Sequence, residues 1–152
     1  MGLRAGTVPL PLAVGFGVAA RLASQENMAD SIRINRLRDL LLDRLRDGID
    51  GLVVNGSMDA RINGNLNLCL PAIDAESLLL ELPEIAMSTG SACASGLDAP
   101  SQVLSAIGLS STEVTRSLRL CLGRFTTEEE VKSAADRIIS TSERLADSQS
   151  QA

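Results

Sequence analysis

Two short segments of the chain, 64–70 and 117–122, alternate leucines with polar residues or cysteine. The leucines of the two segments are Leu66, Leu68 and Leu70, then Leu118, Leu120 and Leu122. Successive side chains of a β-strand point to opposite faces, so this alternation predicts two strands that each turn a leucine face to the core. Cys69 falls on the polar side, where a small, half-buried strand residue is expected. Further strands are predicted at 51–55 and 84–87.

Apolar residues at helical spacing predict the remaining elements. Asp74 is placed to cap a helix over the AESLLLEL segment, and Thr126 with Glu129 has the spacing of a capping box. Gly48 is a natural helix end. The predicted helices are 12–25 (entered through Pro11), 30–47, the segment after Asp74, 100–108, 111–116 and about 127–146.

This order of elements predicts an α+β fold, a small and mostly antiparallel sheet packed against helices. The length of 152 residues fits one domain, so we expect residues 1–152 to form a single domain.

The composition points to a globular protein with an aliphatic core. The chain is 45% hydrophobic and 22% charged, and Phe16 and Phe125 are its only aromatic residues. A net charge of −5 and the scarcity of base-stacking side chains argue against nucleic acid as a partner.

The chain contains no histidine, which excludes Ser-His-Asp and Cys-His mechanisms within it. Its three cysteines, Cys69, Cys93 and Cys121, are far apart and form no CxxC pair. That spacing favours neither a disulfide framework nor a metal site. We therefore expect no bound metal, reduced thiols and a cytoplasmic protein.

The first residues imitate a secretory signal, with a basic residue followed by an apolar run and small residues. Pro9 and Pro11 interrupt the run, and the helical pattern continues beyond any cleavage point. A membrane-spanning helix needs about 20 apolar residues, so we expect no membrane span. A secreted domain remains an alternative interpretation of this segment.

Cys93 lies in the stretch STGSACASG at 88–96, where every other residue is Ser, Thr, Gly or Ala. A structural cysteine prefers apolar neighbours and burial, whereas small residues and glycines let a side chain reach different places. Cys93 is therefore a candidate for chemistry, the alternative being an exposed turn that happens to contain a cysteine. No Lys, Arg or His lies within ten residues of it to lower the pKa of its thiol.

Two further candidates are Arg119 and the segment RAGT at 4–7. Arg119 projects from a predicted strand opposite the leucine face, and its planar fork suits a carboxylate. The ordinary alternative is a surface arginine paired with a glutamate, and Arg124 is a weaker candidate still. In RAGT, glycine beside Thr7 can offer a backbone N–H and a hydroxyl to a phosphate, although the tetrapeptide is not a P-loop.

Together these segments resemble a known family. RAGT-x-P-x-P, GNLNL, ESLLLEL, STGSACASG and SLRLCLGRFTTEEEV occur in the order typical of the C-terminal part of cysteine desulfurases of the iron–sulfur cluster assembly branch. The resemblance covers roughly residues 3–146, and the combination of the cysteine loop with the GRFTTEEE segment is its most specific part.

The resemblance implies the fold of the C-terminal small domain of a fold-type-I pyridoxal phosphate (PLP) enzyme that forms homodimers. It implies transfer of sulfur from L-cysteine, giving L-alanine and a persulfide that passes to an acceptor scaffold protein. By this match, Cys93 carries the persulfide, Arg119 holds the substrate carboxylate, and Thr7 reaches the cofactor phosphate of the partner subunit. PLP would act as the electron sink, and the loop of small residues would let Cys93 move between substrate and acceptor.

The PLP-binding half of the family is missing from the sequence. Lys132, the only lysine, lies in the final helix and cannot be matched to the cofactor lysine. The chain begins just before RAGT, so we expect a portion of a desulfurase that needs a large domain or a homodimer partner. The alternative is a stand-alone persulfide-carrying or sulfur-relay module without PLP chemistry.

Overall fold

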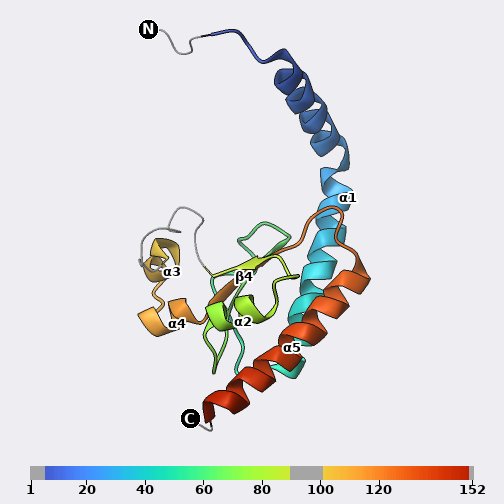
Figure 1. Ribbon diagram of the computed structural model, residues 1–152. Helices are drawn as coiled ribbons and strands as arrows, with labels where there is room; N and C mark the ends of the chain where they lie inside the picture. The colour runs from blue at the N-terminus through green and yellow to red at the C-terminus, as the bar shows by residue number, and fades with distance from the viewer. Residues whose placement is uncertain (1–5, 90–100, 151–152) are drawn as a thin grey trace.

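The computed structural model describes residues 6–89 and 101–150 (Figure 1). Along the chain, a long helix comes first and another comes last, and the short strands and short helices lie between them. The elements are α1 (Leu10–Gly48), β1 (Val53–Val54), β2 (Asn65–Cys69), α2 (Ala75–Glu81), β3 (Met87–Ser88), α3 (Gln102–Ala106), α4 (Ser111–Thr115), β4 (Ser117–Cys121) and α5 (Glu128–Ser150).

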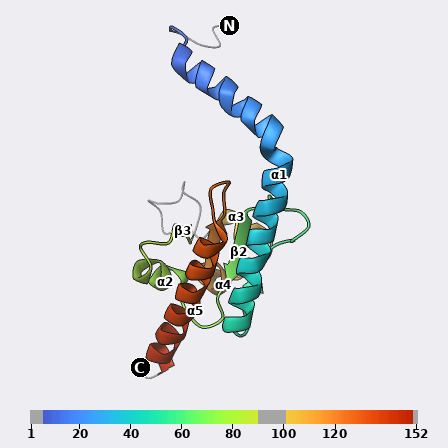
Figure 2. The same ribbon diagram turned by 90° about the vertical axis from the view of Figure 1, so that its right-hand side faces the viewer.

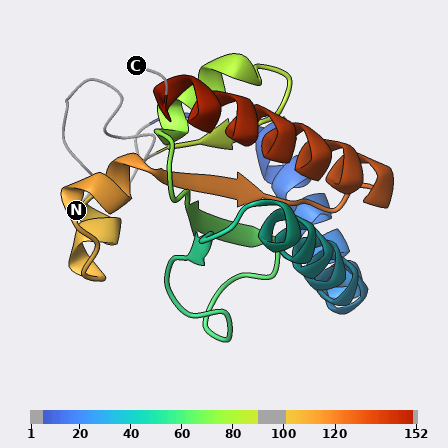
Figure 3. The ribbon, with the colours of Figure 1, turned by 90° about the horizontal axis from the view of Figure 1, so that it is seen from below.

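Among the described residues, four strands form one sheet in the order β1-β2-β4-β3, and every neighbouring pair is antiparallel. Figure 3 shows the strands in this order, with α3 and α4 beyond one end of β4. In the central pair, Leu66 lies opposite Leu120 and Asn67 opposite Arg119. The predicted α+β fold with an antiparallel sheet is confirmed. The edge strands β1 and β3 are shorter than predicted, and residues 84–86 are not part of a strand.

The leucine faces of β2 and β4 form the centre of the core, as their alternation predicted. Leu66 and Leu118 are 0% exposed, and Leu68 and Leu120 are almost as deeply buried. The C-terminal half of α1 and the amphipathic helix α5 pack side by side over this face, and α2 contacts α5 (Figure 2). Burial of these aliphatic side chains supplies the main driving force for folding.

Residues 10–48 form one continuous helix, so the prediction of two helices divided near residues 27–30 was wrong. No proline or glycine interrupts the segment between 18 and 47, and the residues there are mostly good helix formers. At 1.5 Å per residue the helix is roughly 58 Å long.

Only the C-terminal half of α1 packs against the sheet. Its buried residues lie between Leu37 and Leu45, and the N-terminal half extends away from the rest of the protein (Figures 1 and 2). Apolar side chains in that half remain uncovered, with Leu12 72% and Phe16 77% exposed. Within residues 6–89 and 101–150, no helix has the length and apolar character needed to cross a membrane.

Two predicted helix caps were tested by the structure, and one of them lies elsewhere. The Asp74 carboxylate accepts a hydrogen bond from the Glu76 N–H at 3.0 Å, as expected for an N-cap. At α5, however, the reciprocal bonds join Thr127 and Glu130, one residue later than predicted. The Thr126 hydroxyl instead accepts the N–H of Gly123 at 3.0 Å, within the turn that follows β4.

The buried leucine layer predicts a large difference between two leucine substitutions. Leu66→Ala removes a fully buried side chain, and we expect it to lower the free energy of unfolding by about 2–5 kcal/mol. Leu80→Ala is the matched control, because Leu80 is 74% exposed on α2 and its loss should change the free energy by less than about 0.5 kcal/mol. Urea unfolding followed by circular dichroism measures both, and equal effects would contradict this assignment of the core.

Candidate functional site

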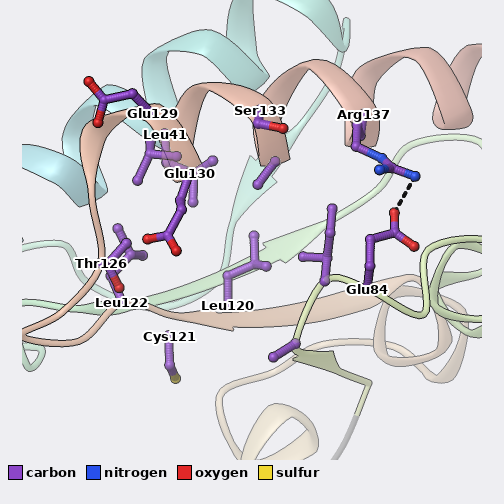
Figure 4. A pocket seen from close by; sticks show the side chains of 14 residues that line it. Leu41, Glu84, Leu120, Cys121, Leu122, Thr126, Glu129, Glu130, Ser133 and Arg137 are labelled. Carbon is purple, nitrogen blue, oxygen red and sulfur yellow. Dashed lines mark ion pairs between the residues drawn. The ribbon is translucent and has the colours of Figure 1, made fainter.

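The side of the sheet opposite the leucines carries the polar residues, and we call it the polar face. Its members on the two central strands are Asn65, Asn67, Cys69, Ser117, Arg119 and Cys121. Figure 4 shows the Cys121 side chain on the opposite side of β4 from Leu120, pointing away from α5. The alternation that builds the core therefore also gathers every polar strand residue on the other face.

Arg119 is at the centre of this face. It is exposed on β4, between Asn67 on β2 and Ser88 on β3, which are its two cross-strand neighbours. No side-chain hydrogen bond or ion pair joins the Arg119 guanidinium to any other described residue. Within the same described part of the chain, Arg124, Arg137 and Arg144 each pair with a carboxylate. A guanidinium that faces solvent without an acidic neighbour can bind an external carboxylate by donating hydrogen bonds to it.

A hydrogen-bond network joins members of the polar face to the segments beside it. Asn55, which follows β1, donates through Nδ2 to Asn67 Oδ1 at 2.7 Å and to Ser117 Oγ at 2.8 Å. The Ser117 hydroxyl donates in turn to the backbone carbonyl of Glu113 at 2.6 Å. Asn55 and Ser117 are buried, and Arg61 Nη2 donates to the carbonyl of Asn55 at 2.7 Å. The network ties β1, β2, β4 and α4 together.

Asn55, Asn67 and Ser117 were not among the candidate residues predicted from the sequence. The alternation in 64–70 already placed Asn67 on the face away from the core, so its location could have been predicted. The contact between Asn55 and Ser117 joins residues 62 positions apart, and no sequence pattern indicates it.

Cys93 lies outside the described residues. The segment that contains it starts directly after β3, whose last residue, Ser88, is the cross-strand neighbour of Arg119. It ends at α3, where the Ser101 hydroxyl caps the helix. Its assignment as the reactive thiol therefore stays a prediction.

The other two cysteines lie on the polar face, and their thiols are free. Cys69 is half-buried, and its Sγ lies 3.6 Å from the carbonyl oxygen of Glu113. Burial first, and then the negative charge of Glu113, raise the pKa of the Cys69 thiol. Cys121 is exposed. We therefore expect Cys69 to react more slowly than the exposed Cys121.

The structure does not bring Thr7 close to Arg119. Thr7 is exposed just before α1, and the helix contacts the core only from Leu37 onward. The intervening 27 helical residues correspond to roughly 40 Å. A role for Thr7 at a cofactor phosphate therefore requires a site other than the one around Arg119 of the same chain.

Arg124, the weaker arginine candidate, has a structural role. Its guanidinium pairs with Glu26 and with Asp30 on α1, the latter at 3.0 Å. Arg33 on α1 donates to the carbonyl of Thr126 at 2.7 Å. These contacts attach the turn between β4 and α5 to the middle of α1.

A pocket of about 590 Å³ lies between α5 and the sheet (Figure 4). Its walls include Leu41, Leu120 and Val131, and the ion pair of Arg137 with Glu84, at 2.5 Å, belongs to its lining. Figure 4 shows Leu120 turned toward α5. Arg119, its neighbour on β4, points to the opposite face because side chains alternate along a strand. The pocket therefore lies on the leucine side of the sheet, and Cys121 is the one residue of the polar face that also belongs to its lining.

The residues of this chain do not build a complete PLP site. A Schiff base needs a lysine amine, and the only lysine, Lys132, lies on the exposed side of α5. Its ammonium pairs with Glu128 one turn earlier at 2.8 Å, and 45% of its side chain is exposed. With no histidine to stack on the cofactor ring, a site for PLP needs residues from outside this chain.

Comparison with known proteins places this geometry in a family. The family model described as aminotransferase class-V matches residues 1–133, and the chain belongs to that family. It is 43% identical over 144 residues to a cysteine desulfurase IscS of Ehrlichia chaffeensis and 45% identical over 144 residues to a mitochondrial cysteine desulfurase of Arabidopsis thaliana. These alignments cover 95% of this chain and 35% and 32% of the relatives.

A solved structure of a NifS-like protein resembles this one with a TM-score of 0.79 at 25% identity, over 92% of this chain and 35% of that one. The predicted resemblance to cysteine desulfurases is thus confirmed, and with it a family that depends on PLP. The chain spans about a third of the length of the curated relatives it matches.

The position of Lys132 predicts how the chain by itself responds to the cofactor. Mixing the purified chain with PLP should give no absorbance band of a protein Schiff base, and Lys132→Arg should give the same spectrum. A band that is present in the wild type and absent in Lys132→Arg would contradict this description of the site.

The two cysteines of the polar face should differ in alkylation rate. With iodoacetamide near pH 7, we expect Cys69 to be modified at least severalfold more slowly than Cys121, because Cys69 is half-buried and its raised pKa leaves less thiolate. Raising the pH increases the thiolate fraction of Cys69, so its rate should rise until the pH passes that raised pKa. Peptide mass spectrometry at several pH values measures both rates, and faster modification of Cys69 would oppose this assignment.

Proposed function

We propose that residues 1–152 form one domain, the C-terminal small-domain part of a PLP-dependent cysteine desulfurase. In this function, the sulfur of L-cysteine is transferred to the thiol of Cys93, which becomes a persulfide, and L-alanine is released. The persulfide sulfur is then used for iron–sulfur cluster assembly. The observation that carries the proposal is Arg119, which faces solvent without an acidic partner among the described residues, beside the strand that leads into the Cys93 segment.

Each candidate residue has one role in this proposal. Arg119 binds the carboxylate of L-cysteine through its planar fork. Cys93 is the sulfur acceptor, and the small residues around it allow the persulfide to reach a second protein. Thr7 binds the cofactor phosphate of a partner subunit, which agrees with the roughly 40 Å of helix between Thr7 and the core of its own chain.

The proposal also requires partners. The PLP-binding part, with its lysine, comes from a large domain or from a homodimer partner. The N-terminal half of α1 is the surface we assign to that contact, because Leu12 and Phe16 are exposed there. A scaffold protein accepts the sulfur, and the reduced thiols of Cys69 and Cys121 agree with a cytoplasmic location.

A stand-alone sulfur carrier is the second candidate function. The absence of a suitable lysine from the chain favours it, since such a carrier needs no PLP. It differs from the first proposal in one requirement, because its Cys93 would accept sulfur from a donor without any large domain.

A reconstitution assay tests the first proposal. The chain is supplied with PLP, L-cysteine, a reductant and the PLP-binding part of a relative, and the release of L-alanine and sulfide is measured. We expect both products with the wild-type chain and a fall to the background level with Cys93→Ser, because the persulfide then has no acceptor thiol.

Cys121→Ser is the matched control, since it removes an exposed thiol from the same chain. It should retain wild-type activity. Equal products from wild type and Cys93→Ser would refute the role of Cys93, and products from the chain without the PLP-binding part would refute the requirement for a partner.

A further inference from the structure

The direction of each hydrogen bond in the network that joins Asn55, Asn67, Ser117 and Glu113 is determined by its last acceptor. The carbonyl of Glu113 can only accept, so the Ser117 hydroxyl donates to it. The lone pairs of Ser117 Oγ then accept from Asn55 Nδ2, and the second N–H of Asn55 donates to Asn67 Oδ1. The orientation of the Asn67 amide is thereby fixed, with its oxygen toward Asn55.

This orientation leaves the Asn67 NH₂ group as a donor on the polar face. No described residue accepts a hydrogen bond from it. Arg119 lies directly opposite on β4, and directly opposed residues of an antiparallel pair have their Cβ atoms about 5 Å apart. Two donor groups, the Asn67 NH₂ and the Arg119 guanidinium, thus lie side by side, with no acidic group of the described residues between them.

We propose that Asn67 is a second binding residue for the substrate carboxylate, beside Arg119. A carboxylate offers about four lone-pair sites, so it can accept the guanidinium fork and one further N–H. Asn55 and Ser117 are positioning residues, because they act only by holding the Asn67 amide in the orientation that presents its NH₂ group. The identity of the substrate as L-cysteine rests on the proposed function.

The Asn67→Asp variant separates ligand binding from structure. The aspartate keeps an oxygen that accepts from Asn55, so the network retains its bonds. It replaces the donor by a negative charge opposite Arg119, which repels a carboxylate ligand and competes for the guanidinium. Asn65→Asp is the matched control, because it makes the same change on the same face of β2, opposite Cys121 rather than Arg119.

The test is an NMR titration of the isotope-labelled chain with L-cysteine under reducing conditions. We expect a saturable shift of the Arg119 Nε–H and Asn67 side-chain NH₂ signals. Cysteamine, which is L-cysteine without its carboxylate, should not cause it. Asn67→Asp should weaken binding at the Arg119 signal by at least about tenfold, the equivalent of one hydrogen bond to a charged group, and Asn65→Asp by less than about twofold.

Wild-type affinity in Asn67→Asp, or no shift at Arg119 in the wild-type chain, would overturn the inference. The backbone amide spectrum shows whether each variant is folded, and if Asn67→Asp is not, Asn67→Ser is titrated under the same criteria. The titration involves no sulfur transfer, so it separates the two proposals. Carboxylate binding that depends on Asn67, together with no L-alanine in the reconstitution assay, would refute the proposed function alone.

Discussion

The antiparallel pairing of β2 with β4 determines both sides of the sheet at once. With Leu66 opposite Leu120 and Asn67 opposite Arg119, four leucines face the helices and the polar residues face away from them. A shift of either strand by one residue would expose its leucines and bury Arg119 or Asn67, so the hydrophobic core enforces the register. The position of the candidate binding residues is therefore a consequence of the same burial that stabilises the fold.

The buried polar network adds a second constraint to this pairing. Asn55 bonds to Asn67 through its side chain, and its backbone N–H donates to the Asn67 carbonyl at 2.9 Å. A buried polar side chain such as Asn55 costs free energy unless it forms hydrogen bonds. Here every hydrogen bond that Asn55 donates reaches an acceptor on β2 or β4. The network thus favours one arrangement of three strands, and it includes Asn67, the cross-strand neighbour of Arg119.

The alternation of leucines was sufficient to predict the two central strands and the face that carries Arg119. Local signals also predicted the Asp74 cap correctly, because a cap depends on residues two or three positions apart. The cap of α5 lies one residue later than predicted because two adjacent threonines could each cap the helix. The Thr126 hydroxyl accepts a hydrogen bond within the preceding turn, and Thr127 caps the helix. The continuous helix over 10–48 was not predicted because polar residues near 27–30 resemble helix caps. In the structure, helix propensity and the ion pairs of Arg124 with Glu26 and Asp30 stabilise the helix across this segment.

Some residues of the candidate site could likewise be predicted from local sequence patterns, and others could not. Arg119 and Asn67 follow from strand periodicity, while Asn55 and Ser117 depend on contacts between distant segments. The roles of Cys93 and Thr7 come from the family resemblance, and neither local pattern nor the packing of the core could supply them. The lack of a cofactor lysine was visible directly in the sequence.

The proposed transfer of sulfur to Cys93 is tested most directly by the mass of the peptide that contains Cys93 after incubation with L-cysteine. With PLP and the PLP-binding part of a relative present, we expect a gain of one sulfur atom on that peptide, and no gain when either component is left out. A gain from L-cysteine in the chain alone, or sulfur found on Cys121 and not on Cys93 in the complete mixture, would contradict it.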